Sequence, residues 1–197
     1  MESESCKRMG IYIDVDNVEK GSSDYRSEGM VIDYAELVNQ ISKGYELVVL
    51  NGYDCEVNNT NGFDVRAFLE GMGITPVLSK PQTKHDLNGQ KVLVQKEVDT
   101  GICTHVTRDI YKGKVDVAVI VSGDRDMYPP VQCAEEDGLD VRVYALEVTL
   151  KDGYAEILGD RLTYIDDLPV FVMTSDATAQ PENNISSSVI KGVTVDE

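Results

Sequence analysis

The sequence predicts an α/β fold in three layers, with a mostly parallel, Rossmann-like sheet, helices on both faces and a β-hairpin insertion. Short apolar runs typical of buried strands alternate with segments whose apolar residues recur at helical spacing. The run at 116–121 is the most continuously apolar, as expected for a central strand covered on both faces. This alternation favours βαβ units with parallel strands. We expect the strand order 3-2-1-4-5.

The first half of the chain is expected to supply three strands and the helices between them. Val31, Tyr34, Val38 and Ile41 recur at helical spacing, and Gly44 follows where a C-terminal cap belongs. The expected elements are a strand at 9–14, a loop at 17–29, a helix carrying these apolar residues, a strand at 45–50, a helix at 61–72 and a strand at 74–79.

The second half begins with the insertion. Asn88-Gly89 lies between extended flanks of alternating polarity, a strong signal for a hairpin over 80–97. Pro129 suits the first turn of a helix, and Gly138 lies beyond its end. The remaining elements are a helix at 98–111, a strand at 116–121, a helix at 129–137 and a strand at 141–146. Residues 151–168 are expected to form a short helix and a last short extended piece at 162–165. We expect one domain over 1–173 and a flexible tail over 174–197.

Composition indicates a globular cytoplasmic protein. The chain of 197 residues is 42% hydrophobic and 27% charged, which fits one domain with a sizeable core. No apolar run reaches the roughly 18 residues of a membrane span, and the polar start of the chain lacks the apolar core of a signal peptide. The four cysteines form no CxxC pair, so we interpret them as reduced thiols.

The net charge of −17 bears on the choice of partner. A strongly acidic protein repels polyanions, so two interpretations stay open. In one, the protein does not touch nucleic acid. In the other, it binds nucleic acid through bound cations and a local basic strip. The residues Lys80, Lys84, His85, Lys91 and Lys96 gather around the hairpin, either as a solvated, charged edge or as a guide for a nucleic-acid backbone.

Aspartates follow two strands that the predicted order makes neighbours. Asp14 ends the first strand, and Asp124 and Asp126 follow the fourth. Open α/β sheets bind ligands outside the carboxyl ends of their strands, where the strand order reverses. We therefore expect Asp14 to lie beside Asp124. A single aspartate at such a place often caps a helix, and Asp126 is an equally good cap for the helix entered at Pro129.

Asp99 is expected to join them from the helix at 98–111. It lies on the apolar stripe of Ile102, Val106 and Ile110, one turn nearer the start of the helix. The helix runs antiparallel to the strand that follows it, so its amino terminus lies near the carboxyl end of that strand. A first-turn acid favoured by the helix dipole is the alternative.

Several carboxylates held together require positive charge among them. Mg²⁺ or Mn²⁺ supplies it and keeps positions open for water and phosphate oxygens. Such an ion activates water and stabilises a phosphate being cleaved. No Ser-His-Asp set competes, because His85 and His105 show no evident partner in the sequence. The pattern therefore predicts metal-dependent hydrolysis of a phosphodiester.

Three motifs, in order, resemble the NYN domain family within the PIN-like metal-dependent ribonucleases. They are IDVDN at 13–17, KEVD at 96–99 and VSGDRDMYP at 121–129, followed by DGLDV at 137–141. The resemblance implies a divalent-metal endoribonuclease, with RNA or single-stranded DNA as partner. It implies Asp14, Asp99, Asp124 and Asp126 as catalytic metal ligands. It also implies that Asn17 and Ser122 support the substrate site and that Lys96 faces the substrate phosphate.

Two further interpretations belong to other classes. Asp14-Val15-Asp16 resembles the nucleophile motif of haloacid-dehalogenase-type phosphatases, but Leu50-Asn51-Gly52-Tyr53 does not match the Ser or Thr motif that such enzymes place after the second strand. A catalytically inactive NYN-type binding or regulatory module, acting as a homodimer or with a protein partner, would suit the acidic charge.

Overall fold

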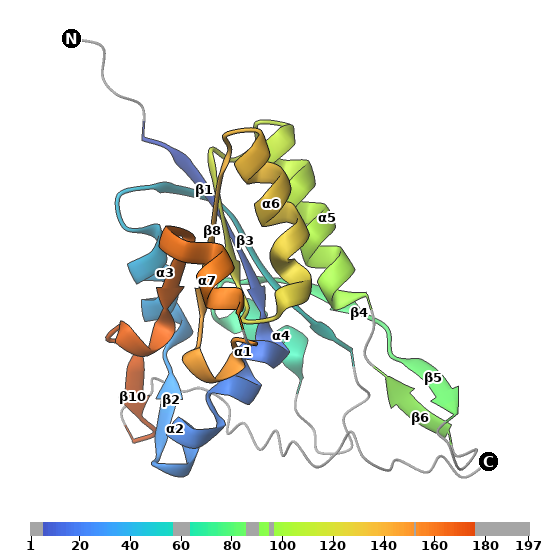
Figure 1. Cartoon of the computed structure of the whole chain (residues 1–197). Helices are drawn as coiled ribbons and strands as arrows, with labels where there is room; N and C mark the ends of the chain where they lie inside the picture. The colour runs from blue at the N-terminus through green and yellow to red at the C-terminus, as the bar shows by residue number, and fades with distance from the viewer. Residues whose placement is uncertain (1–5, 57–63, 86–90, 95–96, 152, 176–197) are drawn as a thin grey trace.

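The computed structural model describes residues 6–56, 64–85, 91–94, 97–151 and 153–175, and within them the main sheet has six strands. Their order is β4-β3-β1-β7-β8-β9, and each neighbouring pair runs parallel (Figure 1). The strands are β1 (Arg8–Asp14), β3 (Glu46–Cys55), β4 (Thr75–Ser79), β7 (Val117–Val121), β8 (Asp140–Ala145) and β9 (Leu162–Tyr164). The predicted α/β class, with helices on both faces of a mostly parallel sheet, is therefore confirmed.

The predicted order of five strands differs from this order. Leu162–Tyr164 is a sixth strand, β9, which extends the sheet beyond β8, and the segment Met30–Ile32 forms a strand, β2, outside the sheet. β1 lies between β3 and β7, with Ile13 opposite Val121. The carboxyl ends of β1 and β7 therefore lie side by side, which brings the segment after Asp14 next to the segment after Val121.

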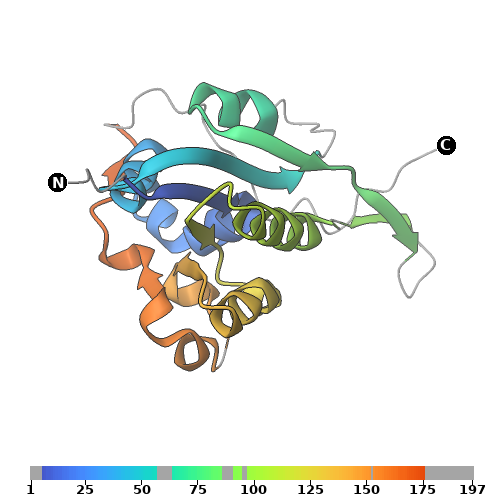
Figure 2. The same cartoon turned by 90° about the horizontal axis from the view of Figure 1, so that it is seen from above.

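Helices cover the sheet on both faces (Figures 1 and 2). On one face lie α1 (Val15–Gly21), α3 (Tyr34–Ser42) and α4 (Val65–Gly71), and on the other lie α5 (Val98–Tyr111), α6 (Tyr128–Glu136) and α7 (Tyr154–Leu158). The short helix α2 is Ser23–Ser27, and the 3-10 turns are η1 (Arg125–Met127), η2 (Glu147–Thr149), η3 (Gly159–Arg161) and η4 (Ile165–Asp167). No helix in the described ranges is long and apolar enough to cross a membrane.

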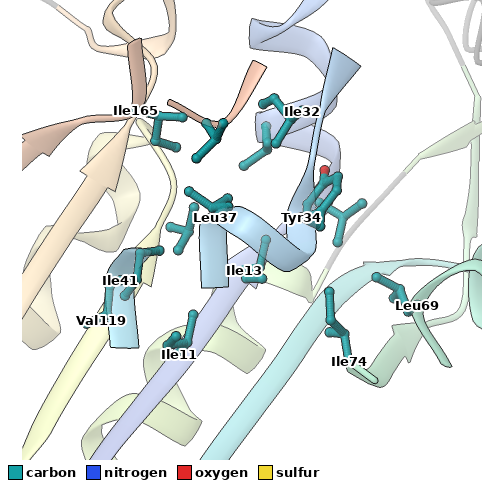
Figure 3. Close-up of a cluster of buried hydrophobic side chains, with 14 of the residues drawn as sticks. Ile11, Ile13, Ile32, Tyr34, Leu37, Ile41, Leu69, Ile74, Val119 and Ile165 are labelled. Carbon is teal, nitrogen blue, oxygen red and sulfur yellow. The ribbon is translucent and has the colours of Figure 1, made fainter. Parts of the chain in front are cut away.

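The alternation of side chains along β1 divides the core in two. Ile11 and Ile13 point into the cluster under α3 and α4, and Tyr12 points into the cluster under α5 and α6. Figure 3 shows the first cluster, where Leu37 and Ile41 of α3 lie over Ile11, Ile13 and their neighbours. Every residue of β7 is buried, as its continuous apolar run predicts. Burial on both faces fixes β1 and β7, and with them the two loops that follow.

Two small antiparallel sheets lie outside the main one. β2 (Met30–Ile32) pairs with β10 (Phe171–Met173), and β5 (Gln82–His85) pairs with β6 (Lys91–Val94). The second pair forms an arm that extends away from the body of the protein (Figures 1 and 2). The turn Asn88-Gly89 that was expected to join these strands lies outside the described residues.

Several predicted boundaries were wrong. The loop expected at 17–29 is largely helical, because the Asp14 carboxylate caps α1 by accepting a hydrogen bond from the backbone N–H of Asn17. Val31 belongs to β2, and α3 begins only after Asp33, whose side chain caps it. The second strand continues through Asn51-Gly52 to Cys55, because β4 pairs with it over this stretch.

Candidate metal centre at the carboxyl edge of the sheet

Asp14 is the most buried acid of the candidate site, with 5% of its surface exposed. It ends β1, and its backbone is still extended when α1 begins. One carboxylate oxygen, Oδ1, accepts a hydrogen bond from the Asn17 backbone N–H at 3.2 Å, and Oδ2 accepts one from the Ser122 hydroxyl at 2.9 Å. Asp14 therefore has a fixed orientation set by both strand-end loops.

Asn17, in the first turn of α1, and Ser122, directly after β7, join these two segments. The Asn17 side-chain oxygen accepts a hydrogen bond from the Gly123 backbone N–H at 2.9 Å. The Ser122 hydroxyl donates to Asp14 and accepts from the Asp124 backbone N–H at 3.2 Å. Both side chains thus hold the protein's own groups in place around the acids.

Asp124, and not Asp126, is the capping residue after β7. Its Oδ1 atom accepts a hydrogen bond from the Asp126 backbone N–H at 3.0 Å, which caps η1, while α6 has no side-chain cap. The alternative role predicted for Asp126, capping the helix at Pro129, is therefore wrong. The Asp126 side chain lies exposed in η1.

Asp99 lies in the first turn of α5, but it is exposed and not on the buried stripe as expected. The buried stripe begins with Val98 and continues with Ile102 and Val106, so Asp99 lies at its open rim. Partial desolvation raises the pKa of Asp99, and the negative charges of Asp124 and Asp126 raise it further. These three acids, from two segments, therefore share one electrostatic environment.

The charge of Asp14 belongs to the same environment. Burial raises the pKa of Asp14 to about 6, against the hydrogen bonds from Asn17 and Ser122, which lower it. The charges of Asp99 and Asp16 add to the increase. Asp99 therefore links the acids electrostatically, because its charge acts on Asp14 and the charges of Asp124 and Asp126 act on it, and a bound cation would relieve this repulsion.

Sequence reasoning missed Asp54. It lies near the end of β3, the other neighbour of β1, one position after Tyr53, which is paired with Asp14. Burial raises its pKa to about 7, the backbone hydrogen bond from Cys55 lowers it, and the charges of Asp16 and Asp14 raise it. Ending the second strand at Leu50 hid an acid that a longer strand would have placed at the same edge.

Sequence reasoning also missed Lys151, which follows β8 and η2. Its ammonium nitrogen lies 3.2 Å from Asp124 Oδ1. This positive charge lowers the pKa of Asp99 as well, against the larger effects of desolvation and of Asp124 and Asp126. Lys96, the residue expected to face the phosphate, lies outside the described residues.

His105 has a partner that the sequence did not show. Its Nδ1 atom lies 2.8 Å from the hydroxyl oxygen of the buried Tyr53, and the Asn51 side-chain amide donates to the same hydroxyl at 3.2 Å. This contact fixes α5 on β3, and it contains no serine or cysteine nucleophile. The side chain of His85 lies outside the described part of the chain.

The donors suit Mg²⁺ or Mn²⁺ in type, because both ions prefer carboxylate oxygens. Among the described residues, no three acidic, histidine or cysteine side chains are placed so that they could hold one ion together. Mg²⁺ needs no such cage, since it usually binds through one or two carboxylates and completes its coordination with water and substrate phosphate. The arrangement fits an open site of this kind.

Gly123 is required by close packing at this site. A Cβ atom on Gly123 would lie 2.0 Å from Thr149 Oγ1 and 2.8 Å from the Thr149 backbone carbon. We expect Gly123→Ala to lower the free energy of unfolding by about 1–3 kcal/mol, as overpacking does. Gly101→Ala, near the start of α5, where a Cβ atom would lie 3.7 Å from the nearest Tyr53 atom, should instead raise the free energy of unfolding by roughly 0.5–1 kcal/mol. Urea denaturation measures both changes in the free energy of unfolding. Equal stability of the two variants would contradict the close packing of Gly123 against Thr149.

Comparison with known proteins identifies the family and supports the fold. The NYN domain model matches residues 8–156. A crystal structure of a protein of unknown function from Vibrio parahaemolyticus is similar in fold, with a TM-score of 0.67 and 22% sequence identity over 85% of this chain and 98% of that one. No curated protein is significantly similar in sequence. The match spans β1, α5 and β7, the elements that carry the four aspartates, and the chain therefore belongs to the NYN domain family.

Proposed function

We propose that this protein is a divalent-metal-dependent endoribonuclease. NYN domains are generally nuclease-like and commonly bind RNA. The observation that carries the proposal is the pair of hydrogen bonds of the Ser122 hydroxyl, which join the Asp14 carboxylate to the backbone of Asp124. Burial raises the pKa of Asp14 and of Asp99; the charge of Asp99 adds to the increase at Asp14, and the charges of Asp124 and Asp126 add to it at Asp99. In this proposal Asp14, Asp99, Asp124 and Asp126 are the catalytic residues around Mg²⁺ or Mn²⁺, which one or two of their carboxylates would bind directly.

A divalent ion would supply positive charge that stabilises a phosphate during cleavage and lowers the pKa of water. The contribution of the protein's own residues is to position the acidic side chains. Ser122 and Asn17 hold Asp14 in one orientation and join the start of α1 to the loop after β7. We assign both residues to the substrate site in this positioning role, and Lys96 to the substrate phosphate.

The net charge of −17 makes cations essential to this function. An RNA backbone approaching an acidic protein is repelled unless bound ions or local basic groups neutralise the edge. RNA binding should therefore depend on divalent ions more strongly than on the sodium or potassium concentration. A binding module without catalysis would share this dependence, so cleavage itself has to be measured.

The test is cleavage of single-stranded and structured RNA by the purified protein with Mg²⁺ or Mn²⁺. We expect Asp124→Asn to reduce cleavage on the order of 100-fold, which corresponds to about 2.7 kcal/mol of transition-state stabilisation. Asp137→Asn is the matched control, because Asp137 is exposed beyond α6, before β8 begins at the opposite edge. Equal cleavage by wild type and Asp124→Asn would identify a contaminating nuclease.

A further inference from the structure

The segment after β8 carries a positive charge into the acidic centre. It turns through η2, where the Thr149 backbone N–H donates to the Leu146 carbonyl at 3.0 Å and the Thr149 hydroxyl donates to the same carbonyl at 2.8 Å. The Glu147 backbone N–H donates to Asp166 Oδ2 at 2.8 Å. These bonds give a defined path to the residues that lead to Lys151.

Close packing places this segment against the end of α1 and against the loop after β7. A Cβ atom on Gly21 would lie 2.4 Å from Thr149 Cγ2 and 2.8 Å from Leu146 Cδ1. Thr149 also fills the space beside Gly123. Two glycines, Gly21 at the end of α1 and Gly123 after β7, therefore admit Thr149, and Lys151 follows Thr149 two residues along the chain.

The Lys151 side chain is largely exposed although the segment that leads to it is closely packed. Its side chain is 63% exposed, while that of Asp124 is 26% exposed, and their charged atoms are 3.2 Å apart. Within the described ranges, Asp14, Asp99 and Asp126 have no lysine, arginine or histidine at ion-pair distance. Lys151 is thus the cation that pairs directly with one of the four predicted ligands in the described structure.

We propose that Lys151 competes with a divalent cation for Asp124 and, once displaced, binds a phosphate group of the substrate. The identification of the substrate as a phosphodiester rests on the proposed function. A lysine ammonium binds phosphate as a compact point charge with three donors on a flexible stem, so the same group pairs first with a carboxylate and then with a phosphate. The displaced ammonium remains at the edge of the site, because its backbone is fixed.

The first test measures Mn²⁺ binding alone, by electron paramagnetic resonance of the free ion. Lys151→Gln should bind Mn²⁺ about 3- to 10-fold more tightly than wild type, the range expected when a partly exposed competing charge is removed. Lys112→Gln removes the same charge beyond the far end of α5 and should change the affinity less than about 2-fold. Lys151→Arg keeps the charge and should bind like wild type. Equal Mn²⁺ affinity in Lys151→Gln and wild type would overturn the competition.

The second test measures the binding of inorganic phosphate in the presence of saturating Mg²⁺. Lys151→Gln should bind phosphate at least about 5-fold more weakly, although it binds the metal more tightly, and Lys112→Gln should not. A merely structural lysine would not change the two affinities in opposite directions. Undetectable phosphate binding by wild type, or unchanged binding by Lys151→Gln, would overturn the phosphate role.

The tests distinguish failure of the proposed nuclease function from failure of the proposed role of Lys151. If wild type cleaves no RNA but Lys151→Gln shifts both affinities as expected, the proposed function is wrong and the role of Lys151 stands. If wild type cleaves RNA and Lys151→Gln binds Mn²⁺ and phosphate like wild type, the role of Lys151 is wrong and the nuclease stands.

Discussion

Replacing Asp14 by Asn is expected to reduce RNA cleavage on the order of 1000-fold and Mn²⁺ affinity by about 10- to 100-fold, because a buried, oriented carboxylate at the metal centre is lost. The hydrogen bonds from Asn17 and Ser122 hold the Asp14 carboxylate in one orientation, so its charge stays directed at the site. An amide accepts at only one of the two positions and carries no charge. Cleavage rates and Mn²⁺ titration measure the two losses.

Asp54→Asn gives the graded comparison for this prediction. Asp54 lies on β3, one strand farther from Asp124 than Asp14 is. We expect its loss to reduce cleavage by about tenfold or less, through a weaker effect on the charge of the site. Circular dichroism should show both variants folded. If Asp54→Asn and Asp14→Asn lose cleavage equally, the site is centred between β3 and β1, and not between β1 and β7.

The free energy of unfolding of the metal-free protein is expected to fall as the pH rises from about 5 to about 8. The pKa of Asp14 is raised to about 6 and that of Asp54 to about 7, mainly by burial. Both groups bind more protons in the folded than in the unfolded protein between pH 4 and their folded pKa. The stability that these two carboxyl groups contribute to the folded protein is therefore complete below their pKa in the unfolded chain. It is lost as the pH rises through their pKa in the folded protein. Together they account for roughly 2–4 kcal/mol.

Urea denaturation at pH 5.0 and 8.0, with and without Mg²⁺, measures this change. In the double variant Asp14→Asn/Asp54→Asn, the free energy of unfolding should change less with pH. For the wild type at pH 8.0, Mg²⁺ should raise the free energy of unfolding by binding the folded carboxylates. Burial lowers the pKa of His105, so the stability that this group contributes is lost as the pH falls, which is the opposite dependence. Stability of the wild type that rises with pH over this range would contradict the raised pKa values.

Much of the fold follows from local pattern. The apolar run of β7 and the alternation in β1 encode burial on both faces, so the class and the neighbouring ends of these strands were predictable. The short strands β2 and β10 were not, because each has three residues and forms only where a partner strand is already in place. The extended piece expected at 162–165 is β9, but its pairing with β8 as a sixth strand was not predicted. β3 was cut short, since Asn51-Gly52 signals a turn in isolation and pairing with β4 overrides it.

The residues of the candidate site were likewise predictable from the sequence only in part. Asp14, Ser122 and Asp124 follow strands whose ends are visible in the sequence, and the structure joins them by hydrogen bonds. Lys151 has no such signal, because its place depends on Thr149 fitting beside Gly21 and Gly123. Asp99 was placed on the buried stripe from helical spacing alone, but the stripe ends at Val98, which leaves the Asp99 side chain exposed.

The hydrogen bonds that join the end of β1 and the start of α1 to the loop after β7 also govern when the acidic centre appears during folding. Asp14 and Ser122 are separated by 108 positions, and Asn17 and Gly123 by 106. Contacts of such long sequence separation form only after the intervening chain has closed a large loop. Nascent chains that end before β7 therefore carry no partly assembled centre, and cation affinity should arise together with the completed native state.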